Sequence, residues 1–312
     1  MASRYYDGSL EGLFGALDEA CRSGALPVLC PRPVLCPRRG PEGQGSLFEA
    51  PGPGTYSGGA FSDPGEDGES ESALLLGEVS LRAYDAVVLA WMSELPIENE
   101  IIRYGWQILR AARDAVAVAA GRPNGVNGVN GPGGSGPDAG TAGSPASWAR
   151  LPEAREAAER VAGRLDHNAD TVLEAAARTR REAHRLEGLL RFEAGPGKAL
   201  TARCEPDHFT LPLLAGHFER RFGDQSWIIM DCRRKLWLIR PRAASPRIVE
   251  QSEAGPFLPG FPDSEEASPP PDTWKTLWRS YFRAVNNEER KNPQLQRNFM
   301  PRRYWKYLPE ME

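Results

Sequence analysis

The chain has 312 residues, of which 40% are hydrophobic and 26% are charged, and its formal net charge is −4 at pH 7. This apolar content is enough for a sizeable core, which at this length we expect to be shared between two lobes. The sequence contains no run of about 18 apolar residues, and its start, MASRYYDGSLEG, lacks the pattern of a secretory signal. It therefore argues against a membrane-spanning or secreted protein and predicts a cytoplasmic one with no membrane partner.

The small net charge conceals a segregation along the chain. Residues 1–148 carry 10 Lys and Arg against 18 Asp and Glu, and residues 149–247 carry 19 against 14. Residues 248–272 carry none against six, and residues 273–312 carry nine against four. This asymmetry favours contact between the C-terminal half and an anion, although a cationic face is also typical of an ordinary solvated surface.

Residues 1–121 are predicted to form a mainly helical N-terminal lobe. Ser9 is expected to cap a helix that ends at Gly24 and carries apolar residues at helical spacing, namely Leu10, Leu13, Phe14, Leu17 and Cys21. Two further helices are predicted over residues 79–93 and 96–121.

Three low-complexity segments divide the chain: residues 27–72, the Gly- and Pro-rich residues 122–147, and the acidic residues 250–271. Their composition cannot bury enough apolar surface to form a core, so they are predicted to be disordered linkers or flexible loops. The five cysteines show no CxxC spacing, which indicates reduced thiols. The sequence therefore predicts neither a metal site nor a cofactor.

Residues 148–312 are predicted to form an α+β domain. A helix with a seam of small residues is followed by strands over 189–193 and 199–205, a helix over 211–222, and a hairpin of strands over 226–232 and 235–240. The seam consists of Leu165, Ala169, Val172, Ala176, Thr179, Ala183 and Leu186. This β-β-α-β-β order predicts a small antiparallel sheet packed with helices.

The C-terminal region is rich in aromatic and cationic residues. An amphipathic helix is predicted with the apolar stripe Trp274, Leu277, Trp278, Tyr281, Phe282 and Val285. The stretch ERKNPQLQRNFMPRRYWKYLPEM, residues 289–311, then holds six cations and four aromatics. Two interpretations are open: a structural lid whose aromatics are core, in which Trp305 docks on the amphipathic helix, or a surface that binds phosphates and stacks bases.

Five stretches of the sequence are similar to motifs of a bacterial family of uncharacterised proteins assigned to DNA metabolism or DNA repair. The resemblance rests on YYDGSLEGLFGALDEA (5–20), GSLF (45–48), EAHRLEGLLRFE (182–193), EPDHFTLPLLAGHFERRFGDQSWIIMDCRRKLWL (205–238) and LWRSYFRAVNNEERKNPQLQRNFMPRRYWKYL (277–308). Members are typically encoded beside a radical SAM protein related to spore photoproduct lyase, and some are fused to a uracil-DNA glycosylase-like domain. This chain has no CxxxCxxC motif, so the resemblance implies that any radical chemistry belongs to the partner.

The resulting expectation is an accessory protein of DNA repair or modification that binds DNA and works with a radical SAM partner. The residues expected to bind nucleic acid are His184, Arg185, Arg233, Arg234, Lys235, Arg290, Lys291, Arg297, Arg302, Arg303, Tyr304, Trp305 and Lys306.

Two alternatives stay open beside that expectation. One is an enzyme on DNA that uses His184 and Asp231, or a Mg²⁺ ion held by Glu205, Asp207, Asp224 and Asp231; the catalytic residues are otherwise unknown. The other is a protein-interaction scaffold with no DNA contact.

Overall fold

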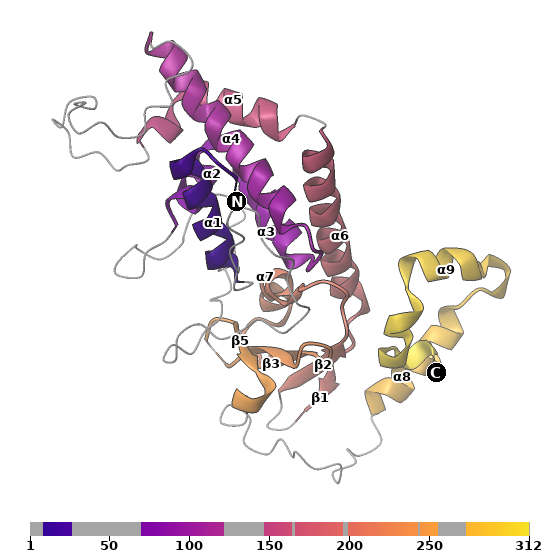
Figure 1. Cartoon of the computed structure of the whole chain (residues 1–312). Helices are drawn as coiled ribbons and strands as arrows, with labels where there is room; N and C mark the ends of the chain where they lie inside the picture. Colours follow the sequence, from indigo (N-terminus) through magenta and orange to yellow (C-terminus); the bar gives the residue numbers. More distant parts are fainter. Residues whose placement is uncertain are drawn as a thin grey trace. The chain divides into compact units, whose positions relative to one another are not determined.

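A computed structural model of the chain describes residues 9–26, 70–121, 147–163, 166–195, 199–242, 244–254 and 273–311 (Figure 1). Most of the three predicted low-complexity segments lies outside these residues. The chain divides into two units, and the division falls between Thr179 and Arg180 inside one helix. No helix in the described ranges has the length and hydropathy needed to cross a bilayer.

The N-terminal unit is built from helices. They are α1 (Leu10–Ser23), α2 (Glu71–Val79), α3 (Leu81–Met92), α4 (Glu98–Ala119), the short η1 (Ser147–Arg150), α5 (Pro152–Ala162) and the first part of α6 (His167–Leu189). Their apolar stripes meet in a core that includes Leu13, Leu76, Ile101 and Ile108, each at most 1% exposed. The Tyr104 hydroxyl donates to the Ala162 carbonyl across 3.2 Å and ties α4 to the end of α5.

Local sequence signals set several helix ends as predicted. The Ser9 hydroxyl accepts from the Gly12 N–H over 2.9 Å at the start of α1, and Gly24 ends that helix with φ +68°. The helix predicted over residues 79–93 begins instead at Leu81, because Ser80 caps α3 with its own hydroxyl. Helix α2, which starts inside the predicted low-complexity segment, was not anticipated.

Residues 147–179 pack with the N-terminal helices. Four alanines of α5 (Ala154, Ala157, Ala158 and Ala162) are buried, and α5 packs along α4. The small-residue seam predicted for α6 is confirmed from Ala169 to Leu186, where all six of its members are buried. The boundary between the two units thus lies inside α6, after Thr179, whereas the sequence places the start of the C-terminal domain at residue 148.

The C-terminal unit contains a five-stranded sheet in the order β1-β2-β3-β4-β5. Its strands are β1 (Glu193–Ala194), β2 (Leu200–Cys204), β3 (Trp227–Asp231), β4 (Leu236–Arg240) and β5 (Arg247–Glu250), and the short η3 (Gln251–Glu253) follows β5. The α+β class is confirmed. The prediction of a purely antiparallel sheet is wrong for one pair, because β2 and β3 run parallel. Helix α7 (Leu211–Phe222) joins these two strands and returns the chain to the same end of the sheet.

The hairpin β3–β4 and helix α7 match their predicted ranges closely. Lys235 occupies the hairpin turn with φ +56°, and Gly223 ends α7 with φ +55°. The strand predicted over 189–193 is mostly wrong, because α6 continues to Leu189 and only the last residue of that range belongs to β1. Strand β5 was not predicted.

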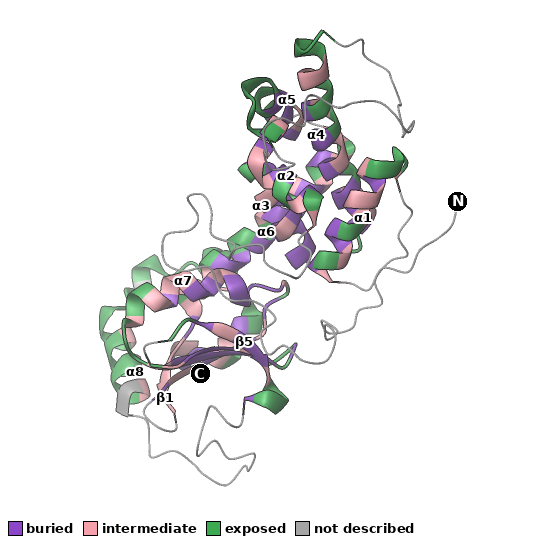
Figure 2. Cartoon of the chain, turned by 90° about the vertical axis from the view of Figure 1, so that its left-hand side faces the viewer, coloured by how far each residue is buried: buried purple, intermediate pink, exposed green. Residues whose placement is uncertain are grey.

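The chain ends in short helices: α8 (Thr273–Val285), η5 (Glu288–Arg290), α9 (Pro293–Phe299), η6 (Arg302–Tyr307) and η7 (Pro309–Met311). Helix α8 forms as predicted, but Figure 2 shows it largely exposed, in green. Tyr304 is 2% exposed and anchors η6, while Trp305 is half-buried and its indole N–H donates to the Met300 carbonyl over 2.8 Å. The buried anchor is therefore Tyr304, and the bond that holds Trp305 goes to the turn before η6 rather than to α8.

Candidate nucleic-acid interface

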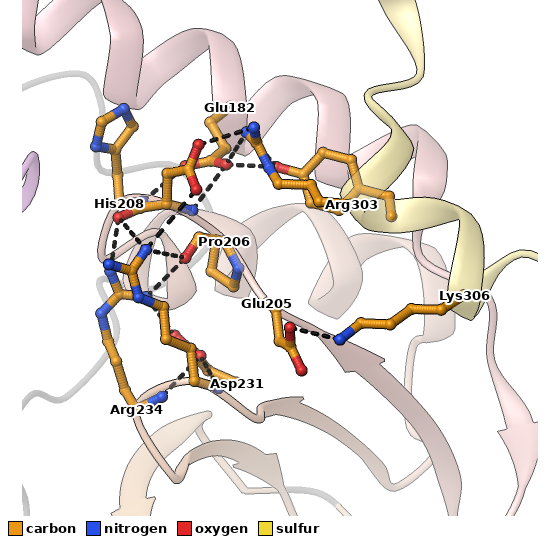
Figure 3. A network of polar contacts seen from close by, with 11 residues as sticks. Glu182, Glu205, Pro206, His208, Asp231, Arg234, Arg303 and Lys306 are labelled. Atoms are coloured by element: carbon orange, nitrogen blue, oxygen red, sulfur yellow. Dashed lines mark hydrogen bonds and ion pairs between the residues drawn. The ribbon is translucent and has the colours of Figure 1, made fainter. Parts of the chain in front are cut away.

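Residues 205–208 follow directly after β2 and are held by side chains from several other elements (Figure 3). The backbone N–H groups of Asp207 and His208 donate to the carboxylate of Glu182 on α6, over 2.9 Å and 2.8 Å. Glu182 itself is only 2% exposed. A buried carboxylate must find donors, and these two backbone groups fix the segment against α6.

The C-terminal segment reaches the same carboxylate through η6. Arg303 Nη2 donates to Glu182 Oε1 over 2.7 Å, and the Tyr304 hydroxyl donates to that oxygen as well. Burial pushes the pKa of Glu182 upward, but the bonds from Tyr304, the two backbone N–H groups and Arg303 outweigh it and hold the pKa below its ordinary value. Burial and the bond to Glu182 raise the pKa of Tyr304, so the phenol stays protonated and donates.

The β3–β4 hairpin grips residues 205–208 from the sheet. Arg234 donates to the Pro206 carbonyl over 3.1 Å and to the Asp207 carbonyl over 2.9 Å, and it pairs with Asp231 at 2.8 Å. Asp231 is fully buried and also accepts from the N–H groups of Arg233 and Arg234. Burial raises the pKa of Asp231, against the pull of Arg234 and these N–H groups.

Glu205 completes this arrangement. It lies 2.6 Å from Lys306 Nζ and accepts from the Tyr307 hydroxyl over 2.7 Å. The bond from Lys306, followed by that from Tyr307, lowers the pKa of Glu205 below its ordinary value. We call residues 205–208, together with the groups of α6, the hairpin and η6 that bind them, the 205–208 hub.

The structure separates the predicted binding residues into two sets. Members of the first bond within the hub, and these are Arg233, Arg234, Arg303, Tyr304 and Lys306. Arg234 is only 6% exposed, so its guanidinium is a structural group of the hub rather than a surface for phosphate.

The second set lies at the surface. The exposed cations Arg290, Lys291, Arg297 and Arg302 follow one another along η5, α9 and η6, and Lys235 is exposed in the hairpin turn. His184 is also exposed and its Nδ1 lies 3.1 Å from Glu187 one turn along α6, while Arg185 and Trp305 are half-buried. The Arg302 guanidinium lies 5.7 Å from the centre of the Trp305 ring. Four of the predicted binding cations thus lie exposed on the C-terminal segment.

The alternative of a Mg²⁺ site finds no support in the described part of the chain. There, no group of three or more His, Cys, Asp and Glu side chains has the arrangement of a metal site. Asp207 pairs with Arg303 at 2.8 Å, and Asp231 is enclosed with Arg234. Asp224 is an exposed residue beyond α7. Glu205, Asp207 and Asp231 serve as partners for cations.

Sequence reasoning missed the two carboxylates that organise the unit, Glu182 and Glu310. Glu310 accepts from Arg191 over 2.5 Å and from the Trp278 indole over 2.9 Å, and its side chain is 2% exposed. A signal existed for Glu182, which lies within the buried seam of α6 between Thr179 and Leu186, where a charged residue calls for a partner. Glu310 had no such signal, since it stands in no periodic segment.

Comparison with known families gives one match. The model of a domain of unknown function, DUF4130, matches residues 151–310. Neither the curated proteins nor the solved structures contain a significant match.

Proposed function

Since the chain belongs to the DUF4130 family, whose domain has no known function, we propose from its own residues that it is a DNA-binding accessory protein of DNA repair or modification. It would work in the cytoplasm with a radical SAM protein. The resemblance of its motifs to DNA-metabolism proteins supports the general role, and the exposed cations of the C-terminal segment support the contact with DNA.

The observation that carries the proposal is the exposure of Arg290, Lys291, Arg297 and Arg302 on one connected segment. Phosphate contacts from Arg and Lys supply most of the affinity of proteins for DNA and position the protein on it. Arg303 and Lys306, the other two cations of residues 289–311, are engaged in the 205–208 hub. The hub therefore supplies the scaffold and the exposed cations supply the contacts.

A fluorescence-anisotropy titration of labelled DNA at several salt concentrations tests this proposal. The Arg290→Ala/Arg297→Ala variant should bind more weakly, with a slope of log affinity against log salt that is smaller by about two. The control is Arg103→Ala/Arg110→Ala, which removes two exposed cations from α4 and should leave the slope unchanged. An unchanged slope in the first variant, or no binding of any DNA by the native protein, would contradict the proposal.

The radical SAM partner is a separate part of the proposal. The chain has no CxxxCxxC motif of its own, so an iron–sulfur cluster for radical chemistry would come from another protein. Size-exclusion chromatography of the purified chain mixed with a radical SAM protein of the kind related to spore photoproduct lyase should give a shared peak, with or without DNA. Separate peaks in both conditions would remove the partner from the proposal.

A scaffold without DNA contact is the second candidate, and one observation favours it. Leu277, Tyr281 and Val285 leave an apolar stripe of α8 more than half exposed, as a protein-binding helix often does. A complex with the radical SAM protein combined with no affinity for DNA would select this alternative.

A further inference from the structure

Helix α8 presents an unusual surface to solvent. Leu277, Tyr281 and Val285 are 53%, 58% and 57% exposed, and their spacing of four residues places them along one stripe. Large apolar side chains grouped on one surface segment mark binding sites more often than they mark ordinary surface.

Trp278, next to this stripe on α8, is held in place by its neighbours. Trp278 and Tyr281 lie with ring centres 5.8 Å apart at an angle of 36°. The Trp278 indole donates to Glu310, which is buried and paired with Arg191, and the Arg191 guanidinium lies 5.2 Å from the centre of the indole ring. Binding energy is not spent on ordering side chains that are already fixed.

The charge around the stripe restricts what can cover it. Residues 273–312 carry nine cations against four anions, and Arg283, Arg290 and Arg297, which follow Tyr281 in sequence, are exposed. The complementary ligand is anionic and presents flat apolar faces. Unpaired nucleotides have both properties, whereas in a duplex the base faces are stacked on one another and inaccessible.

We propose that Trp278 and Tyr281 form a stacking surface for the unpaired bases of single-stranded DNA, whose phosphates meet exposed cations of the C-terminal segment. This inference rests on the proposed function and names its substrate class. Base stacking on aromatic side chains tolerates any sequence, so the site selects for strandedness rather than for a base order.

Three DNA ligands of equal length separate stacking from phosphate contact: an oligothymidylate, an abasic strand with the same phosphates, and a duplex. The native protein should bind the oligothymidylate most tightly. Tyr281→Ala should weaken that binding by roughly 5-fold to 100-fold and should leave binding of the abasic strand unchanged.

Two variants serve as matched controls on α8. Tyr281→Phe keeps the ring and should retain the affinity for the oligothymidylate. Val285→Ala removes a comparably exposed apolar side chain without a ring and should also retain it. All these positions are more than half exposed, so circular dichroism should show that each variant folds.

The possible outcomes distinguish the stacking surface from the proposed DNA-binding function on which it rests. Equal binding of the oligothymidylate and the abasic strand, with Tyr281→Ala unaffected, would overturn the stacking surface and leave DNA binding in place. No binding of any DNA would overturn both. A second copy of the chain is the competing occupant, and light scattering that shows a dimer disrupted by Val285→Ala and Tyr281→Ala alike would also overturn the inference.

Discussion

Glu182 joins several segments of the C-terminal unit through its carboxylate. It is buried, negatively charged and bound by donors from three places: the backbone of residues 207–208, the guanidinium of Arg303 and the phenol of Tyr304. Each donor would lose a strong acceptor if the charge were removed. Arg303 therefore acts as a structural cation, although its sequence neighbour Arg302 is a surface one.

This difference gives the first prediction at the residue scale. Arg303→Ala should lower the free energy of unfolding by about 1–3 kcal/mol, because a charged hydrogen bond to buried Glu182 is lost. Arg302→Ala should lower it by about 0.5 kcal/mol or less, as exposed cations do. Urea denaturation of both variants provides the measurement. Equal stability of the two would show that the bond from Arg303 to Glu182 contributes nothing.

The second residue-scale prediction concerns acid. The folded pKa of Glu182 lies below its ordinary value of 4.5, so its stabilisation is complete above the ordinary pKa and is lost as the pH falls through the folded pKa. Glu205 and Glu310 shift in the same direction, while Asp231 shifts upward and opposes them. Unfolding free energies measured between about pH 6 and pH 3 should fall more steeply for the native protein than for Glu182→Gln. Parallel curves would contradict the assignment.

At the scale of elements, backbone conformation decides where helices end. Gly223 closes α7 with φ +55° and ψ −123°, a region that side chains rarely occupy, and no atom would obstruct an added Cβ there. Gly188 lies inside α6, in helical conformation, and an added Cβ there would also meet no atom. The two glycines therefore differ in backbone conformation alone.

The same substitution should consequently have opposite effects at these two positions. Gly223→Ala should destabilise the protein by about 1–3 kcal/mol, because alanine is strained at this φ and ψ. Gly188→Ala should stabilise it by about 0.5–1 kcal/mol, because alanine has the higher helix propensity and lowers the conformational entropy of the unfolded chain. Thermal unfolding of the two variants tests the pair. A loss of stability at Gly188 would mean that the end of α6 is not helical in solution.

The whole molecule raises a question about its domains. The family model begins at residue 151, but α5 buries its alanines with α4, and the division into units falls at Thr179 and Arg180. The segment that the family model covers, residues 151–310, therefore differs from the C-terminal unit, whose part of α6 begins at Arg180.

A fragment of residues 148–312 tests this distinction. Without α4, the buried face of α5 has no partner, so residues 152–162 should unfold and be cleaved early by protease, while α6 from Arg180 onward and the sheet should stay protected. In the full chain, residues 152–162 should resist the same treatment. Protection of this segment in the fragment would show that the family domain folds as one unit without the N-terminal helices.

Periodicity and local chemistry by themselves determined the α+β class, helices α1, α4, α7 and α8, and the β3–β4 hairpin. Their signals lie within a few residues of one another: Ser9 as a cap, Gly24 and Gly223 as stops, and the two short apolar runs of the hairpin. The buried seam of α6 could also be predicted, because the spacing of its small residues can be read from the sequence without knowing what packs against it.

The tertiary structure alone decided which cations and aromatics of the C-terminal segment are available at its surface. Arg302 and Arg303, or Tyr304 and Trp305, are adjacent and chemically alike, yet one of each pair binds Glu182, more than 100 residues away in sequence, and the other does not. The parallel pairing of β2 with β3 and the exposure of α8 were decided in the same way. Such contacts depend on how distant segments meet, and local spacing carries no information about that meeting.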